Sequence, residues 1–240
     1  MTMYERGPDG DRSLEALRER FDIPLREAML TQRAVRKVLP DPVDEELVVA
    51  LIEFALKAPT GSTGQNWEFI VIKDYETKKK LAKRYRQAWN LYYHTVIRRV
   101  SKKDPSMAKT AKAVQWQVDH FTEVPVLIVA CLKLGAKDGR IPFVPMPHAA
   151  LSGFFGSIYP SVQNLLLAAR AMGLGASLIT LPLWSVTSTR RTLGLPMSVT
   201  PCCVVPLGWP RGRYGPTTRR PVTEVMHLNT YGNRPWMGTG

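Results

Sequence analysis

Residues 157–175 read SIYPSVQNLLLAARAMGLG and form the most informative stretch of the chain. From Ser161 to Met172, apolar side chains fall on nearly every side of a predicted helix, and the Gly-Leu-Gly that follows is typical of a helix C-terminus. A helix with this pattern is enclosed by the rest of its protein or by a second subunit. We therefore expect a packed core around this helix and a homodimer.

Around this helix the sequence predicts one domain of strands and helices, residues 25–240. Runs of β-branched and aromatic residues predict strands at 67–72, 124–129, 176–181 and 199–207, and apolar spacing predicts helices at 24–33, 44–58 and 187–193. Residues 133–150 are rich in Gly and Pro and indicate a loop. The polar residues 1–24 predict a mobile N-terminal extension with a short helix, and residues 211–240 an extended C-terminal tail.

Composition limits the class of protein. The chain has 240 residues, 45% of them hydrophobic and 22% charged, which excludes a disordered chain, a collagen-like repeat and a disulfide scaffold. Its three cysteines, Cys131, Cys202 and Cys203, form no regular disulfide or metal-binding spacing and favour a reducing cytoplasm. Neither a signal peptide nor an apolar run long enough to span a bilayer is present, so we expect a cytoplasmic protein without a membrane partner.

The positive charge of the chain is local. The formal net charge is +13, and residues 73–112 contribute +10 of it, since they hold thirteen Lys and Arg against Asp74, Glu76 and Asp104. Aromatic residues are interleaved with these basic ones and continue to residue 121. This pattern predicts one or two amphipathic helices that cover an anionic, flat binding partner. The alternative is a solvated pair of helices whose aromatic side chains pack underneath.

The sequence lacks the motifs GxGxxG, GxxxxGK[ST] and GxSxG, and it lacks paired His or Cys residues at metal-binding spacing. Its four histidines, His94, His120, His148 and His227, are scattered. We therefore expect no metal site, and no side chain that acts as a catalytic acid, base or nucleophile.

Two short segments favour a phosphorylated ligand. Arg33 and Arg36 lie three residues apart and, in a helical turn, would form a fork around a phosphate; the alternative is that they stabilise a helix end. The small residues of the loop 60–64 would let a planar ligand approach the backbone, although such a loop is also an ordinary turn.

Three ordered blocks carry a family resemblance. The first is Arg33-Ala34-Val35-Arg36, then Pro42-Val43, then Ala58-Pro59-Thr60-Gly61-Ser62 and Gln65-Asn66-Trp67. The second is the stretch 157–175, and the third combines Leu207-Gly208-Trp209-Pro210 with Arg219-Arg220-Pro221. In this order and at these intervals they resemble the FMN-dependent nitroreductase family over roughly residues 25–230.

The resemblance implies an α+β sandwich: a mixed, largely antiparallel sheet flanked by helices, in an intertwined homodimer. It also implies FMN as cofactor, NADPH or NADH as reductant, and a small acceptor such as a nitroaromatic or quinone. The implied cofactor-binding residues are Arg33, Ala34, Arg36, Pro59, Thr60, Gly61, Thr63, Ser157, Leu178, Ile179, Thr180, Leu181 and Arg219. The loop 59–63 would reach the flavin of the other subunit.

The basic segment 73–121 is expected to form a lid over the flavin. Its aromatic residues Trp89, Tyr92, Tyr93 and Trp116 would then contact the substrate, and Lys79, Lys80, Lys83, Arg84 or Arg86 would favour NADPH through its extra phosphate.

The chain departs from the family pattern at several positions: Ala34 replaces a frequent serine, Thr63 an asparagine, Asn66 a proline, and Thr217 or Thr218 a lysine. These departures weaken the expected contacts beside the flavin ring and leave the arginines in place. The competing readings are a basic protein that binds nucleic acid or an anionic surface, and the same fold with iodotyrosine-deiodinase or flavin-fragmenting chemistry. Nucleic acid is the less expected partner, because it explains the charge and not the three blocks.

Overall fold

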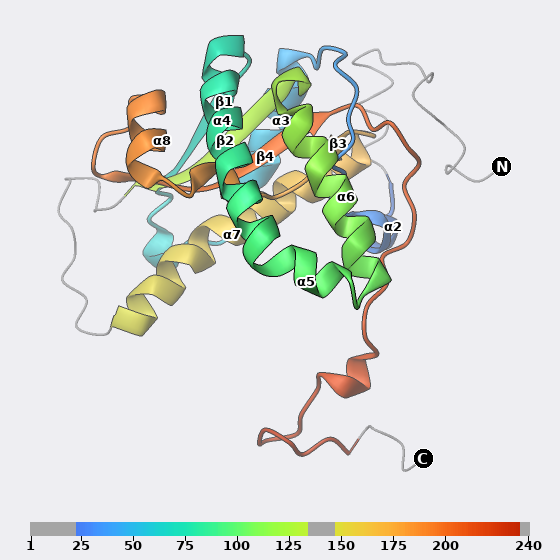
Figure 1. The fold of residues 1–240 in the computed structure, drawn as a ribbon. Helices are drawn as coiled ribbons and strands as arrows, with labels where there is room; N and C mark the ends of the chain where they lie inside the picture. Colours follow the sequence, from blue (N-terminus) through green and yellow to red (C-terminus); the bar gives the residue numbers. More distant parts are fainter. Residues whose placement is uncertain (1–22, 134–146, 236–240) are drawn as a thin grey trace.

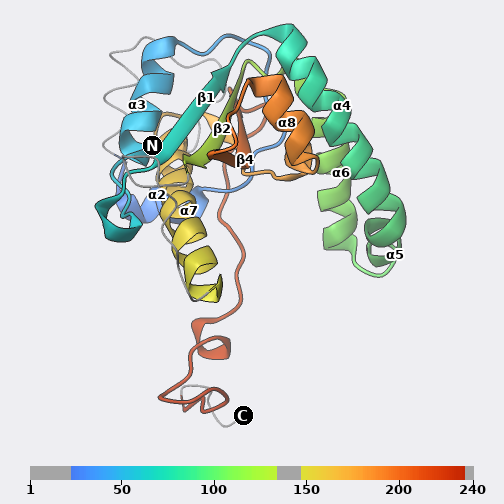
Figure 2. The same cartoon turned by 90° about the vertical axis from the view of Figure 1, so that its left-hand side faces the viewer.

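The computed structural model describes residues 23–133 and 147–235. Its centre is a four-stranded sheet of β1 (Trp67–Ile72), β2 (Val126–Lys133), β3 (Gly175–Ala176) and β4 (Val199–Gly208) in the order β1-β2-β4-β3. Each of the three strand pairings in the described residues is antiparallel. Figures 1 and 2 show helices on both faces of this sheet. The predicted α+β sandwich with a largely antiparallel sheet is confirmed.

Strand β2 separates two hydrophobic cores. Because successive side chains of a strand point to opposite faces, Ile128 and Ala130 join one core while Leu127 and Val129 join the other. The first core also holds α3 (Glu45–Ala55) and α7 (Pro147–Ala171), and the second holds α4 (Tyr75–Tyr92) and α6 (Pro105–Asp119). Seven of the eight residues of β2 are buried, as a strand covered on both faces requires.

Helix α7 is longer than the sequence predicts. It begins at Pro147 and runs through Pro160, although proline removes a backbone donor and ordinarily ends or kinks a helix. The expected helix start at Ser161 and the expected loop end at residue 150 are therefore wrong; residues 134–146 of that loop lie outside the described residues. Helix α3 and the sheet enclose the C-terminal half of α7, so a second subunit is not needed to bury that half.

The predicted strand at 176–181 is reduced to β3 and one isolated bridge between Ile179 and Val204. In this register Pro206 of β4 lies opposite Ser177, and proline has no N–H to continue the ladder. The chain is therefore free to leave the sheet between β3 and the bridge.

The basic segment forms a helical hairpin. Helix α4 passes through a π-helical turn (η4, Tyr93–Ile97) into the short α5 (Arg98–Ser101), and α6 returns toward the sheet. Side chains of Asp74 and Asp104 accept backbone hydrogen bonds at the starts of α4 and α6. The prediction of amphipathic helices here is confirmed.

The remaining described elements are short: α2 (Leu25–Thr31), α8 (Val186–Leu193) and the 3₁₀ turns η3 (Gly61–Thr63), η5 (Phe121–Glu123), η6 (Leu181–Leu183) and η7 (Val222–Glu224). After β4 the chain passes α2 and extends away from the body (Figure 1). The predicted helix within residues 1–22 lies outside the described part. Among the helices that are described, none combines the length and the apolar character needed to cross a bilayer.

Candidate functional site

The segment that carries Arg33 and Arg36 lies outside any helix, so the helical turn assumed for their fork is wrong. The segment runs beside the sheet edge, where Val35 donates its backbone N–H to Ala176 O over 2.9 Å. Gly175 makes this approach possible, since a Cβ there would lie 2.7 Å from Val35 Cγ1. The two arginines are thus fixed next to the residues that follow β3.

Arg36 is a partly buried cation whose Nε has no hydrogen-bond partner in the described residues. Burial lowers the pKa of its guanidinium; Tyr85 raises that pKa and Arg33 lowers it. A desolvated guanidinium beside a second arginine is compensated by an anion or an acceptor. The orphaned Nε therefore fits a phosphorylated or anionic ligand.

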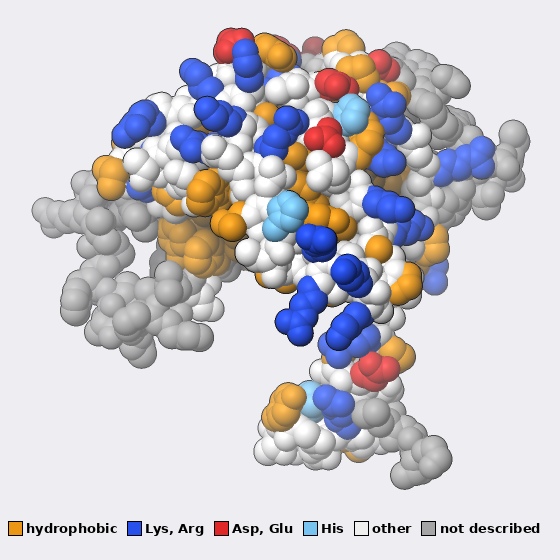
Figure 3. All heavy atoms as spheres, viewed as in Figure 1, with side chains coloured by type: hydrophobic (Ala, Val, Ile, Leu, Met, Phe, Trp, Pro, Cys, Tyr) orange, Lys and Arg blue, Asp and Glu red, His pale blue; other side chains and the backbone are white. Residues whose placement is uncertain are grey.

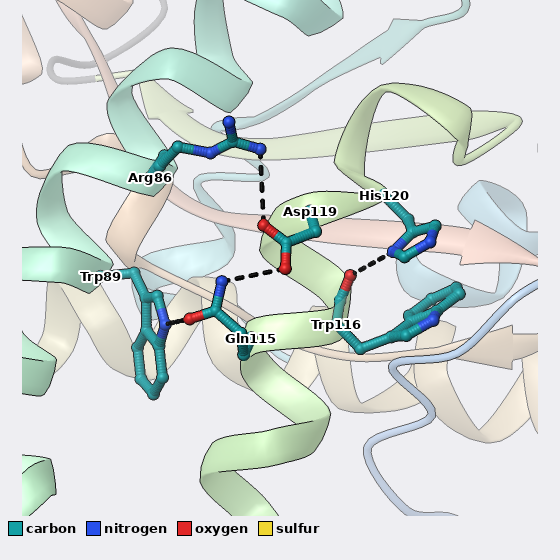
Figure 4. Close-up of polar contacts among 6 residues, drawn as sticks. All are labelled: Arg86, Trp89, Gln115, Trp116, Asp119 and His120. Carbon is teal, nitrogen blue, oxygen red and sulfur yellow. Dashed lines mark hydrogen bonds and ion pairs between the residues drawn. The ribbon is translucent and has the colours of Figure 1, made fainter.

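Two further cations surround Trp116 on α6. Lys37 Nζ lies 5.9 Å and Arg211 Cζ 5.3 Å from the Trp116 ring centroid. The ring also stacks on His120, with centroids 4.1 Å apart and planes at 10°. Figure 4 shows both rings pointing away from the hairpin interior. Trp116, one of the four aromatic residues expected to contact substrate, thus lies beside the arginine segment through Lys37.

The other three aromatic residues lie on or just after α4. Trp89 is 2% exposed, and its indole N–H donates to Gln115 Oε1 over 2.6 Å (Figure 4). Tyr93 packs against Trp89 with ring centroids 5.6 Å apart, whereas Tyr92 is 42% exposed. Trp89 therefore packs inside the hairpin, as the alternative of aromatic side chains packed beneath the helices predicts. Tyr92 lies at the surface.

The stretch Leu178–Leu181 leaves the sheet next to the arginine segment. Ile179 exchanges two backbone hydrogen bonds with Val204, of 2.9 and 2.8 Å, which fixes the stretch at its middle. Leu178 and Thr180 on either side are exposed. Leu181 begins η6, which packs on α4.

The loop 59–63 and Ser157 form a second group. Gly61 N–H donates to Ser157 Oγ over 3.1 Å, and the Ser157 hydroxyl donates to Gly153 O over 2.9 Å. Trp67 Nε1 donates to Ser157 O over 2.7 Å, so β1 also holds this point of α7. Thr63 adopts a positive φ of 51°, while Pro59, Gly61 and Thr63 are exposed. The expected partners Gly61 and Ser157 are in contact.

Helix α7 holds the loop 59–63 at Ser157 and the residue Thr31, just before the arginine segment, at Arg170. Arg170 near its C-terminus donates from Nε to Thr31 Oγ1 over 2.7 Å and lies 4.0 Å over the Tyr214 ring. Next to Tyr214, a Cβ on Gly215 would lie 3.9 Å from Arg33 Nη1. Thirteen residues separate Ser157 from Arg170, which is about 20 Å along a helix at 1.5 Å per residue. One chain thus holds the loop and the arginines well apart.

Arg219 lies in the C-terminal tail, beyond the contact between Arg170 and Tyr214. Its Nη1 donates to Thr218 O over 2.8 Å, and the neighbouring Thr217 donates its N–H to Leu30 O over 2.9 Å. Sequence reasoning missed several residues that complete these surroundings: Lys37, Tyr85, Gln117, Arg170, Ser177, Arg211 and Tyr214. Lys37, Arg170 and Arg211 carried a signal that could have identified them, since they are basic residues within or beside the named blocks. No group of three His, Cys, Asp or Glu suited to a metal occurs in the described residues.

Comparison with known proteins gives a consistent set of similarities. Residues 29–209 match the model of the nitroreductase family. An NADH dehydrogenase of Thermus thermophilus is 28% identical over 202 residues, covering 83% of this chain and 93% of that protein. An iodotyrosine deiodinase of Nematostella vectensis is 25% identical over 213 residues, covering 84% of this chain and 73% of that protein.

A solved structure shares the fold. The crystal structure of oxidised iodotyrosine deiodinase bound to FMN and 3-iodo-L-tyrosine superposes with a TM-score of 0.69 at 20% identity, covering 87% of this chain and all of that one.

Proposed function

The chain belongs to the nitroreductase family of flavoprotein oxidoreductases, and from this premise we propose that it is a homodimeric, cytoplasmic FMN enzyme. In the proposed reaction NADPH or NADH delivers reducing equivalents, and a nitroaromatic or quinone acceptor receives them. The observation that carries the proposal is the pair Arg33 and Arg36, because the buried Nε of Arg36 has no partner in the described residues.

Each group of residues has its own task at the cofactor. Arg33 and Arg36 supply charge for the phosphate and the anionic side of the ring, Ala34 contributes backbone, and Arg219 is a second phosphate partner. Leu178, Ile179, Thr180 and Leu181 line the ring. Pro59, Thr60, Gly61, Thr63 and Ser157 complete the site from the partner subunit.

Bound FMN would supply the redox chemistry between the nicotinamide and the acceptor. The chain's own contribution is electrostatic. Arg36 is already desolvated, so its charge stabilises a nearby negative charge more strongly than it would in water. No acid–base pair is needed from the side chains, in line with the absence of any catalytic triad in the sequence.

The separation along α7 supports the dimer. A site that needs both the arginines and the loop 59–63 draws them from two chains. Within one chain the loop is held at Ser157 and the segment before Arg33 at Arg170, which are about 20 Å apart on α7. The exposed apolar residues Leu25, Met29 and Leu30 on α2 and Phe155 on α7 offer surface for a second copy.

The hairpin supports NADPH as the reductant. Lys and Arg side chains outnumber acidic ones on the face in Figure 3. Lys79 is paired with Glu76, Arg86 with Asp119, and Arg84 with Ser188. Lys80 and Lys83 are exposed and are therefore the best candidates for the extra phosphate. Equal catalytic efficiency with NADH and NADPH at low salt would contradict this preference.

Reductive deiodination of an amino acid is the second candidate, favoured by the deiodinase relative. An amino-acid substrate brings an ammonium group, which a free carboxylate would bind. In residues 73–121, all of which the structure describes, the four carboxylates already have partners within the hairpin: Thr77 N, Lys79, Ser106 N and Arg86. We therefore rank nitro or quinone reduction first.

The first test is the visible absorption spectrum of the purified protein, then the same spectrum after anaerobic NADPH and, separately, NADH. A bound yellow flavin that bleaches supports the proposal, and the two bleaching rates measure the preference for the extra phosphate. A colourless protein that cannot be reconstituted with FMN would overturn it and favour the basic-surface reading.

A further inference from the structure

A buried chain of polar side chains links three elements of the proposed site. Tyr85 on α4 donates its hydroxyl to Gln117 Oε1 over 3.1 Å, and Gln117 Nε2 on α6 donates to Ser177 Oγ over 3.0 Å. Each of the three residues is 1% exposed. Buried polar groups are costly unless they are bonded, so a satisfied chain of this kind specifies one arrangement of its elements.

Both ends of the chain lie beside residues assigned to the ligand. Ser177 directly precedes the stretch Leu178–Leu181, and Ala176 before it accepts the backbone bond from Val35. At the other end, Tyr85 belongs to the same hydrophobic core as Val35 and Val38, which flank Arg36. The hydrogen-bonded series Tyr85, Gln117 and Ser177 therefore reaches the proposed ring-lining stretch at one end and the arginine segment at the other.

The direction of the hydrogen bonds fixes the role of Gln117. Its side-chain oxygen accepts from Tyr85 and its nitrogen donates to Ser177, so one amide holds both neighbours at once. No apolar side chain or carboxylate makes both bonds in this geometry. Within residues 23–133 and 147–235, this amide is thus the one side chain of the helical hairpin that hydrogen-bonds to Ser177.

We propose that Gln117 is a positioning residue: with Tyr85 and Ser177 it sets the hairpin against the stretch 177–181 and so preorganises the ligand site around Arg36. This rests on the proposed function for the identity of the ligand, FMN. The two hydrogen bonds of Gln117 are present in the protein without ligand, so their role is tested separately from FMN binding.

Gln115 provides a matched control on the same helix. It also makes two side-chain bonds, accepting from Trp89 Nε1 and donating from Nε2 to Asp119 Oδ2 over 3.0 Å (Figure 4). These bonds stay within the hairpin and touch neither Ser177 nor the arginine segment. A general weakening of the hairpin would follow from either substitution.

The experiment compares Gln117→Leu with Gln115→Leu in the full chain. Amide hydrogen exchange of the protein without flavin is expected to rise at residues 177–181 and 33–37 in Q117L only. The dissociation constant for FMN, measured by quenching of flavin fluorescence, is expected to rise about tenfold in Q117L, equivalent to about 1.4 kcal/mol, and to stay within about twofold in Q115L. The absorption maxima of bound flavin are expected to shift in Q117L only.

Two further variants keep the test decisive if Q117L folds poorly. Tyr85→Phe and Ser177→Ala each remove one bond and leave the amide in place, and both are expected to weaken FMN binding in the same direction. Equal effects of Q117L and Q115L on exchange and on FMN affinity would overturn the proposal. If the wild-type protein binds no flavin, the proposed function fails, and the exchange data still decide whether Gln117 holds 177–181.

Discussion

The guanidinium of Arg170 lies 4.0 Å over the ring of Tyr214 and also donates to Thr31 and Glu27, so one side chain of α7 fastens both α2 and the start of the tail. Replacing Arg170 with Met keeps the aliphatic stem and leaves the buried Thr31 hydroxyl without this donor. We expect a loss of about 2 kcal/mol in the free energy of unfolding, measured by urea denaturation.

The control for this loss is Arg191→Met on the exposed side of α8, expected to change stability by less than about 0.5 kcal/mol. Limited proteolysis is expected to cut R170M earlier within 211–235. A tail that stays equally resistant would show that Arg170 does not hold it.

The close contact of Gly175 with Val35 gives a second prediction. A methyl group at residue 175 overlaps Val35 Cγ1, so Gly175→Ala displaces the arginine segment and is expected to cost about 1–3 kcal/mol of stability. Gly212→Ala meets nothing within 4 Å and is expected to be neutral. Thermal unfolding of the two variants measures the difference. An unchanged midpoint in G175A would mean that the segment shifts without cost.

The arginine pair gives a prediction about ligand chemistry. Replacing both Arg33 and Arg36 with Lys retains the charge and removes the planar donor fork. The dissociation constant for FMN is expected to rise about tenfold or more, since a bidentate arginine–phosphate contact is lost. Riboflavin, which lacks the phosphate, serves as the comparison ligand. A similar loss of affinity for both flavins would argue against a phosphate role.

The three cysteines give a prediction about pH. Burial raises the pKa of Cys131 and Cys203 from 9.0 to about 12, and of Cys202 to about 11. Since thiols in the folded protein deprotonate at higher pH than in the unfolded chain, their contribution to stability is complete below pH 9 and is lost toward pH 11–12.

At pH 8 the native protein is therefore expected to leave all three thiols unmodified by a thiol reagent, and the urea-unfolded protein to react at three. The labelled mass, read by mass spectrometry, reports the count. Rapid labelling of the folded protein would contradict the burial of these side chains.

Local patterns in the sequence were sufficient for most of the fold. Strand β1 falls on the predicted residues 67–72, and the helices around residues 25, 45 and 186 follow from apolar spacing. The extension of α7 through Pro160 could not be predicted this way, because local preference places a helix start after proline. The shortening of the strand after Gly175 depends on Pro206, which is its neighbour only across the sheet.

The candidate site was predictable only where residues stand in named blocks. Arg36, Gly61 and Ser157 belong to such blocks, and the structure brings Gly61 and Ser157 together. Tyr85, Gln117 and Ser177 are separated by 32 and 60 residues along the chain, so no local periodicity relates them. Trp89 illustrates the reverse case, because an aromatic residue on a basic helix gives the same pattern whether it faces a ligand or the core.

The length of α7 between Ser157 and Arg170 has a consequence for mixtures of two variants of this chain. In the proposed dimer each site takes its arginines from one chain and its loop from the other. In a mixed dimer of one chain without the arginine fork and one chain with Ser157→Leu, one site would contain both substitutions. The other site would contain neither. The two variants, unfolded and refolded together, are then expected to regain tight flavin binding at one site of each mixed dimer through subunit complementation, whereas each variant refolded alone keeps its weakened binding.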